Sequence, residues 1–255
     1  EEGFTLQIGN GQEIANVTGI MTINDFRSED VSKGGQGAPL VPIGDRHLFA
    51  EFPICLNIGG IANVSYEMNG RRIAYDICMA NQLLNYLANK LGYDYDNNGQ
   101  FAKQGKVDKE LFDILNDNAY YKQDAPKSLG REFFENVQHK IIDESSLSVN
   151  DLLATATEHI AHQIVKSTDN LEKSKMLVTG GGAKNNFLIE RICSLSKHEI
   201  VIPDVMITDF KEALIFAFLG VLKMEGKINV LSSVTGASSD SSSGKTYQVE
   251  LKVEN

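Results

Sequence analysis

The sequence predicts an α/β fold, and the order of its elements between residues 175 and 202 is the main reason. An apolar strand at residues 175–179 runs into three glycines, and a helix at residues 185–195 and a strand at residues 199–202 follow. Strand, glycine turn, helix and strand in this order are typical of α/β domains. Apolar residues spaced three to four apart elsewhere in the chain indicate further amphipathic helices.

The first third of the chain reads mainly as strands. Residues 4–8 alternate like a strand, residues 12–18 form a short predicted helix, and residues 19–23 form a second apolar strand. A glycine-rich loop at residues 34–39 follows. Two apolar strands joined by Gly-Gly then predict a tight hairpin over residues 54–66.

Helices dominate after a third strand at residues 72–77. Leucines at helical spacing predict a helix over residues 79–91, and residues 107–115 form another. Ser148 starts a third helix as its N-cap, with an acidic residue at the N3 position. The ten apolar residues 213–222 are too few to span a bilayer, which takes about 20, so they predict a buried core helix.

Two polar features carry no predicted chemistry. The serine-rich residues 238–244 read as a mobile, low-complexity segment. His159 and His162 lie three apart on a predicted helix without the HExxH pattern of a zinc site, so exposed helix histidines are predicted.

Composition and charge narrow the function classes. The 255 residues are 42% hydrophobic and 23% charged, which is ordinary for a globular protein. With 24 basic and 34 acidic residues, the formal charge is −10. This balance disfavours nucleic acid and anionic membranes as partners. A nucleotide can still bind, because backbone amides and helix termini hold phosphate locally.

The cysteines indicate neither a disulfide framework nor a zinc site. Cys55, Cys78 and Cys193 are scattered, odd in number and form no CxxC pair. A reducing cytoplasm is the expected compartment.

The strongest candidate binding motif is the turn Gly180, Gly181 and Gly182, between a strand and a helix. Because glycines have no side chains, a ligand can approach their backbone closely, and the helix N-terminus favours anions. A plain strand-to-helix turn is the alternative, although one glycine would serve it.

The hairpin tip is a second candidate. Gly59 and Gly60 lie between Asn57 and Asn63, and glycine amides at a hairpin tip can form a nest for phosphate oxygens. Structural hairpins carry Gly-Gly as well, so the motif alone leaves both readings open.

Asp76 is the third candidate. It is expected at the C-terminal end of the strand over residues 72–77, where ligands of open α/β sheets bind. A carboxylate there can act as a general base, or it can cap the following helix.

Several segments, in order, resemble the anhydro-N-acetylmuramic acid kinase family, and together they cover nearly the whole chain. The matching segments are residues 25–27 (DFR), 34–42 (GGQGAPLVP), 56–63 (LNIGGIAN), 126–132 (PKSLGRE), 178–182 (VTGGG), 212–213 (EA) and 234–237 (VTGA).

The resemblance implies an actin-like, ribonuclease H-like two-domain kinase fold, with ATP and Mg²⁺ as cofactors in the cleft. It implies phosphorylation of O6 of 1,6-anhydro-N-acetylmuramic acid while water opens the anhydro bridge, giving N-acetylmuramic acid 6-phosphate and ADP. This is a reaction of cell-wall recycling in bacteria.

The resemblance also assigns roles to residues. Asp76 matches the aspartate that activates the water, and this favours the base over the cap. The loop with Asn57, Gly59, Gly60 and Asn63 corresponds to a phosphate loop. The three glycines Gly180, Gly181 and Gly182 correspond to the turn on the adenosine side. Four residues match positions of the sugar or phosphate side: Asp25, Arg27, Asn81 and Glu212. No residue is assigned as a metal ligand.

Two departures from the family pattern modify these expectations. Ile77, Cys78, Met79 and Ala80 replace a Thr-Gly-Pro-Gly stretch, although Asn81 keeps its place. The family's first phosphate hairpin, Gly-Thr-Ser-Leu-Asp-Gly, and its later His-Gly-Gln segment have no counterpart here.

We therefore expect an incomplete first domain at residues 1–50, a second domain at residues 51–227 and a C-terminal segment at residues 228–255 that returns toward the first. The chain as given is expected to lack activity. A non-catalytic module that binds sugar and nucleotide is the alternative function. The expected partners are small molecules, with a homodimer left open.

Overall fold

The computed structural model describes residues 8–250, which form two units. The first unit is drawn from Glu1–Phe49, Met68–Ile73 and Glu212–Asn255, and the second from Ala50–Glu67 and Ala74–Lys211. The strand expected at residues 4–8 falls almost entirely outside the described residues. Within the described part of the chain, no helix is both long and apolar enough to cross a membrane.

The second unit is built on a five-stranded mixed sheet in the order β4-β3-β2-β5-β6, which confirms the α/β class. The hairpin is present as predicted, with β2 antiparallel to β3, while β5 runs parallel to both β2 and β6. The strands are β2 (Ile54–Ile58), β3 (Ile61–Met68), β4 (Arg71–Met79), β5 (Lys175–Thr179) and β6 (Glu199–Val201). Because β2 and β5 are parallel neighbours, their carboxyl ends reach the same edge of the sheet.

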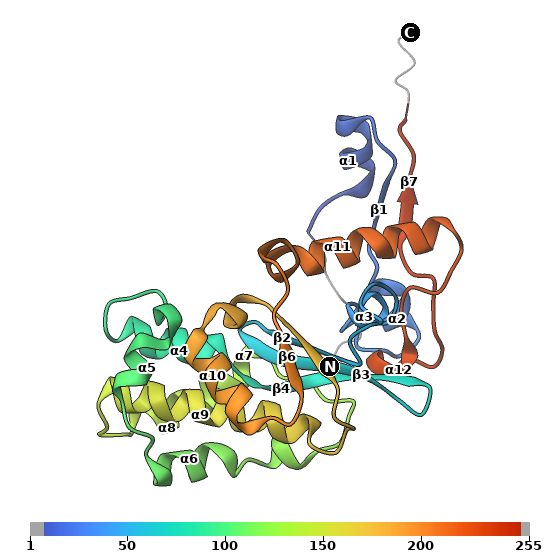
Figure 1. Cartoon of the computed structure of the whole chain (residues 1–255). Helices are drawn as coiled ribbons and strands as arrows, with labels where there is room; N and C mark the ends of the chain where they lie inside the picture. Colours follow the sequence, from blue (N-terminus) through green and yellow to red (C-terminus); the bar gives the residue numbers. More distant parts are fainter. Residues whose placement is uncertain (1–7, 251–255) are drawn as a thin grey trace. The chain divides into compact units, whose positions relative to one another are not determined.

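The long helix α9 (Val149–Thr168) is the centre of the helical layer. Its N-cap is Ser148, whose hydroxyl accepts the Asp151 N–H, as predicted. Figure 1 shows α9 running between α6 and α10 beside the sheet, in agreement with its contacts. The other helices of this unit are α4 (Asn81–Asn89), α5 (Gln100–Gln104), α6 (Lys109–Asn116), α7 (Arg131–Phe133), α8 (His139–Asp143) and α10 (Asn186–Leu195), with 3₁₀ or π turns at Asn97–Gly99, Ala119–Lys122, Phe134–Gln138 and Gly181–Lys184.

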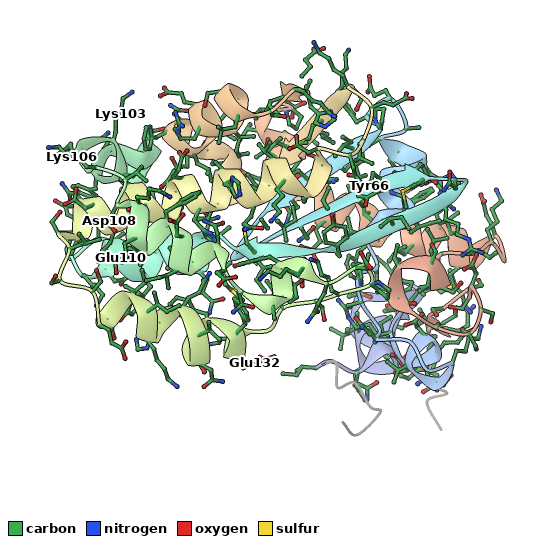
Figure 2. The ribbon with its side chains drawn as sticks, turned by 90° about the horizontal axis from the view of Figure 1, so that it is seen from below. Tyr66, Lys103, Lys106, Asp108, Glu110 and Glu132 are labelled. Atoms are coloured by element: carbon green, nitrogen blue, oxygen red, sulfur yellow. The ribbon has the colours of Figure 1, made fainter. Side chains whose placement is uncertain are left out.

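Charged side chains gather where α5 ends and α6 begins. Figure 2 shows Lys103, Lys106, Asp108 and Glu110 at this end of the unit. The Asp108 carboxylate accepts the Leu111 N–H and so caps α6. This surface is explained by helix capping and solvation.

His159 corrects the prediction of exposed helix histidines. Its side chain, which projects from α9, is fully buried. Nδ1 lies 2.9 Å from Asn116 Oδ1, and Nε2 lies 3.3 Å from the Tyr121 hydroxyl. Burial lowers the His159 pKa to about 3, so the ring is neutral at physiological pH. Helical periodicity alone could not tell this polar core position from a surface position.

The first unit contains a two-stranded antiparallel sheet of β1 (Thr22–Asn24) and β7 (Lys245–Tyr247). Its helices are α1 (Gly11–Thr18), α2 (Ser28–Ser32), α3 (Pro42–Leu48) and α12 (Ser232–Thr235). The buried Asp30 carboxylate accepts the Gly37 N–H at 2.9 Å and the Thr235 hydroxyl at 2.7 Å. A single buried acid therefore orders the glycine-rich loop at residues 34–39.

Two predictions about this part of the chain were wrong. The second half of the serine-rich segment is packed, although residues 238–240 are exposed: Ser241 and Ser243 are buried, and Ser243 is bonded through its N–H and carbonyl to the Asn229 side chain. Helix α11 (Val205–Met224) was predicted as a buried core helix, but it buries only one face. Ile215 and Leu219 are buried, whereas Leu214 and Val221 are more than 40% exposed.

Candidate functional site

Two glycine tips lie side by side at the carboxyl ends of β2 and β5. Asn57 is paired with Thr179 across these parallel strands and with Asn63 across the hairpin. The chain then turns at Gly59-Gly60 after β2 and at the three glycines after β5. The structure therefore brings together the two motifs that the sequence singled out separately.

Gly180 and Gly182 are required by close packing between the two tips. A Cβ on Gly180 would lie 2.7 Å from Asn57 Oδ1 and 2.8 Å from the Ile58 carbonyl oxygen, and the Gly180 φ is +85°. A Cβ on Gly182 would overlap the Ile58 side chain. Packing therefore requires glycine at both positions, whether or not a ligand is bound.

We expect Gly182→Ala to lower the free energy of unfolding by about 1–3 kcal/mol, the usual cost of overpacking. Urea unfolding would measure it as a lower midpoint at an unchanged slope. Gly220→Ala, in α11 where an added Cβ meets nothing within 4 Å, is the matched control and should not destabilise the protein. Equal midpoints for Gly182→Ala and the parent protein would contradict the packing argument.

Gly60 and Gly181 differ from these two, because both are exposed at the tips. A Cβ on Gly181 would meet only Asn81 Nδ2, at 3.4 Å, and one on Gly60 only the Gln82 Cβ, at 3.8 Å. Within residues 8–250, the N–H groups of Gly60 and Gly181 donate no hydrogen bond. Two open backbone donors at adjacent tips suit the oxygens of an anion.

Asn81 is bound to the hairpin tip. Its side-chain Nδ2 donates to the Ile58 carbonyl at 3.2 Å, and its N–H donates to the Gly59 carbonyl at 3.1 Å. The N–H groups of Ala80 and Gln82 donate to the Gly60 carbonyl at 2.8 and 3.2 Å. The free N–H groups at the start of α4 thus donate to carbonyls of the hairpin tip instead of to a side-chain cap.

Asp76 lies inside β4, which corrects its predicted place at a strand end. The strand continues through Met79, and α4 begins at Asn81. The N-cap of α4 is Ala80, without a side-chain hydrogen bond, so the alternative that Asp76 caps this helix is wrong. The strand is longer than predicted because Ile77, Cys78 and Met79 are apolar and buried.

The Asp76 carboxyl is half-buried, and burial raises its pKa. The Leu129 N–H donates to Asp76 Oδ2 at 2.9 Å and lowers the pKa, but burial is the larger effect. A carboxylate with a raised pKa is a stronger base than an exposed one, which suits general base catalysis.

Three candidate residues belong to the first unit, and two of them already have partners there. Asp25 accepts hydrogen bonds from Ser28 and pairs with Lys245 Nζ at 2.7 Å. Burial raises the Asp25 pKa, but these hydrogen bonds outweigh burial and leave the pKa lowered. Arg27 Nη1 donates to the Gly37 carbonyl at 2.6 Å. The Glu212 side chain, on α11, is exposed.

Sequence reasoning did not connect residues 120–129 with Asp76. Tyr120 donates its hydroxyl to the Asp76 carbonyl oxygen, and the Asp76 N–H donates to the Lys127 carbonyl at 3.3 Å. The PKSLGRE segment carried the family resemblance, but no pattern in the sequence pairs it with β4.

Comparisons with known proteins identify the family of this chain. Residues 1–249 match the family described as anhydro-N-acetylmuramic acid kinase. The anhydro-N-acetylmuramic acid kinase of Actinobacillus pleuropneumoniae serotype 7 is 37% identical over 257 residues, which cover 96% of this chain and 70% of the relative. That of Vibrio cholerae is 38% identical over 257 residues, with 96% and 69% covered.

Among solved structures, component A of (R)-2-hydroxyglutaryl-CoA dehydratase from Acidaminococcus fermentans is similar at a TM-score of 0.43 and 16% identity. That similarity covers 69% of this chain and 63% of the other. The family assignment rests instead on the sequence match, which extends over nearly all of the chain and includes both glycine tips and Asp76. The chain therefore belongs to the anhydro-N-acetylmuramic acid kinase family, a family of enzymes.

Proposed function

We propose that this protein transfers the γ-phosphoryl group of ATP to O6 of 1,6-anhydro-N-acetylmuramic acid while water opens the anhydro bridge. In this reaction water adds to C1, the C1–O6 bond breaks, and O6 takes the phosphoryl group. The products are N-acetylmuramic acid 6-phosphate and ADP. The observation that carries the proposal is the pair of glycine tips with open amides, in a chain that matches the kinase family over residues 1–249.

The glycine tips would bind the nucleotide. The N–H groups of Gly60 and Gly181 are exposed donors, and Asn81 lies between them with its side-chain amide close to Gly181. Backbone N–H groups of this kind bind phosphate oxygens without adding net positive charge. Mg²⁺, bound together with the nucleotide, would neutralise charge that develops during transfer.

Asp76 would be the general base that takes a proton from the attacking water. Its carboxyl is half-buried, and burial raises its pKa. Both features favour proton transfer from water over permanent ion pairing.

Asp25, Arg27 and Glu212 would contact the sugar or the transferred phosphate. Arg27 uses Nη1 for the Gly37 carbonyl, so other guanidinium N–H groups can donate to a ligand. Asp25 would have to exchange part of its Lys245 and Ser28 contacts for a sugar hydroxyl. Glu212 is exposed and could accept a hydroxyl hydrogen bond as it stands.

We propose the bacterial cytoplasm as the compartment. The three cysteines are free thiols, two of them buried, which is compatible with a reducing environment.

The test is an assay of the protein with ATP, Mg²⁺ and the anhydro sugar, with the product identified by mass. The product should exceed the substrate by one water and one phosphoryl group, and ADP should form in equal amount. N-Acetylmuramic acid, which has no anhydro bridge, is the control substrate and should react far more slowly. Absence of turnover would agree with the expectation that the chain as given lacks activity. Binding of nucleotide and sugar without turnover would support the alternative of a non-catalytic binding module.

A further inference from the structure

The edge of the sheet is covered at Asp76 by a segment distant in sequence. Strand β4 is an edge strand of the five-stranded sheet, so its outer N–H and C=O groups need partners. The Asp76 N–H donates to the Lys127 carbonyl at 3.3 Å, and the Leu129 N–H donates to Asp76 Oδ2 at 2.9 Å. Residues 127–129 thus bind both the backbone and the carboxylate of Asp76.

Tyr120 adds a third contact to the same residue. Its hydroxyl donates to the Asp76 carbonyl oxygen, and its ring is buried. The N–H, the C=O and the carboxylate of Asp76 are therefore all bound by residues 120–129. A carboxylate held in this way has little rotational freedom, because both its backbone and one of its oxygens are fixed.

Lys127 fastens the two ends of this segment to each other and to the strand. Its Nζ donates to the Tyr120 carbonyl at 3.2 Å and lies 4.8 Å from the Tyr120 ring centroid. The same Nζ lies 5.2 Å from the ring centroid of Tyr75, which is on β4. A half-buried ammonium over two aromatic rings is a favourable contact that an uncharged side chain cannot replace.

The start of the segment is anchored in the core. The Tyr121 hydroxyl lies 3.3 Å from Nε2 of the buried His159, and Gln138 Nε2 donates to the same hydroxyl at 3.4 Å. Tyr75 in turn donates its hydroxyl to the Ser167 carbonyl of α9. Beyond the segment the chain returns to the surface, where Figure 2 shows Glu132 projecting into solvent.

We propose that residues 120–129 clamp Asp76 so that Oδ2 is held by the Leu129 N–H and Oδ1 accepts the proton, with Tyr120 and Lys127 as positioning residues. Within residues 8–250, no hydrogen bond to Asp76 Oδ1 is formed, whereas Oδ2 is bound. Fixing one oxygen aims the other, which is what a general base needs in order to meet a water in one direction. The catalytic consequence rests on the proposed function, but the geometry of the clamp does not.

The clamp has a measurable effect on the carboxyl group. Burial raises the Asp76 pKa, and the Leu129 N–H lowers it in part. Loosening the segment weakens that hydrogen bond, so the Asp76 pKa should rise further. The base then loses its proton only at higher pH, and the acid limb of the rate profile moves up.

The groups around Asp76 do not reverse this direction. Burial raises the pKa of Tyr75, Cys78 and Tyr120, so these groups stay neutral over the working range. Lys127 carries the charge in the clamp; burial lowers its pKa, Asp124 raises it and Lys166 lowers it. The charged and titratable groups of this region are Tyr75, Cys78, Tyr120, Tyr121, Asp124, Lys127 and Lys166.

The experiment compares Tyr120→Phe and Lys127→Met with matched controls from exposed positions. Tyr95→Phe and Lys109→Met make the same chemical changes at side chains that are 61% and 86% exposed and lie outside residues 120–129. The first readout is the Asp76 side-chain carboxyl pKa, followed by ¹³C NMR in the unliganded protein and assigned with Asp76→Asn. The second is the pH profile of kcat/KM.

We expect the Asp76 pKa and the acid limb to move up together by about half a unit or more in both clamp variants, because a charged acceptor loses a hydrogen bond. Turnover should fall about tenfold, less than the loss of the base itself, with little change in KM for ATP. Lys127→Arg keeps the cation over the rings, so its Asp76 pKa and turnover should stay close to those of the parent protein. The controls should match the parent protein.

If the Asp76 pKa is the same in the clamp variants as in the controls, the proposal is overturned, whatever the activity. If either Tyr120→Phe or Lys127→Met does not fold, the other, with Lys127→Arg, still decides. Failure of the proposed function has a different signature, because the parent protein would then show no sugar phosphorylation while the NMR titration still reports on the clamp.

Discussion

In a complete enzyme, Asp76→Asn should reduce turnover by about 10²–10⁴-fold, the usual contribution of a general base, while the affinities for ATP and sugar change little. The amide has nearly the shape of the carboxylate and its oxygen can still accept the Leu129 N–H. Because Asn cannot take a proton from water, only the chemical step should suffer. Single-turnover kinetics with calorimetric titrations of both ligands separate these effects.

The stability of the same variant has a definite sign. Burial raises the pKa of Asp76 in the folded protein above its unfolded value. The stabilisation from this carboxyl is therefore present below the unfolded pKa and is lost as the pH rises through the folded pKa. At neutral pH, Asp76→Asn should be at least as stable as the parent protein, which rules out unfolding as the cause of lost activity.

If Asp76→Asn kept most of its turnover, Asp76 would not be the general base. Asp113→Asn is a suitable control, because Asp113 is exposed and pairs with the neighbouring Lys109 on the surface of α6. It should change neither turnover nor the pH profile.

Local patterns predicted the parts of the fold that are determined locally. The Gly59-Gly60 hairpin, the strand before Gly180 and the Ser148 N-cap were all predicted at nearly their observed positions. Each depends on residues within a few positions of one another, through turn chemistry, alternation or capping. The α/β class followed from their order along the chain.

The candidate site was harder to predict because it depends on contacts between distant segments. Nothing in the sequence shows that Gly182 packs on Ile58, so all three glycines looked equally ligand-related. Likewise, the buried His159 and the pairing of Leu129 with Asp76 are tertiary contacts without a local signal. The end of β4 was misplaced for the same reason, since the strand continues beyond Asp76 through the buried Ile77, Cys78 and Met79.

The structure also changes which glycine reports on nucleotide binding. Gly180 and Gly182 pack against β2, so their substitution tests stability and not ligand contact. Gly181 is exposed, and an added Cβ would meet only Asn81 Nδ2, at 3.4 Å. Gly181 is therefore the position where a side chain can obstruct a ligand without disturbing the fold.

Gly181→Val should weaken ATP binding about tenfold or more, equivalent to about 1.4 kcal/mol, and leave sugar affinity nearly unchanged. The branched side chain would occupy the space through which phosphate oxygens reach the open Gly181 N–H, while the unfolding midpoint stays close to that of the parent protein. Calorimetric titration with ATP and with the sugar measures both affinities, and Gly220→Val, placed on α11 in open space, is the control. Gly181→Ala should fall between the two, since a single methyl group obstructs less. An ATP affinity of Gly181→Val equal to that of the control would reduce all three glycines to a structural turn and would leave the Gly60 tip as the remaining candidate for the phosphate site.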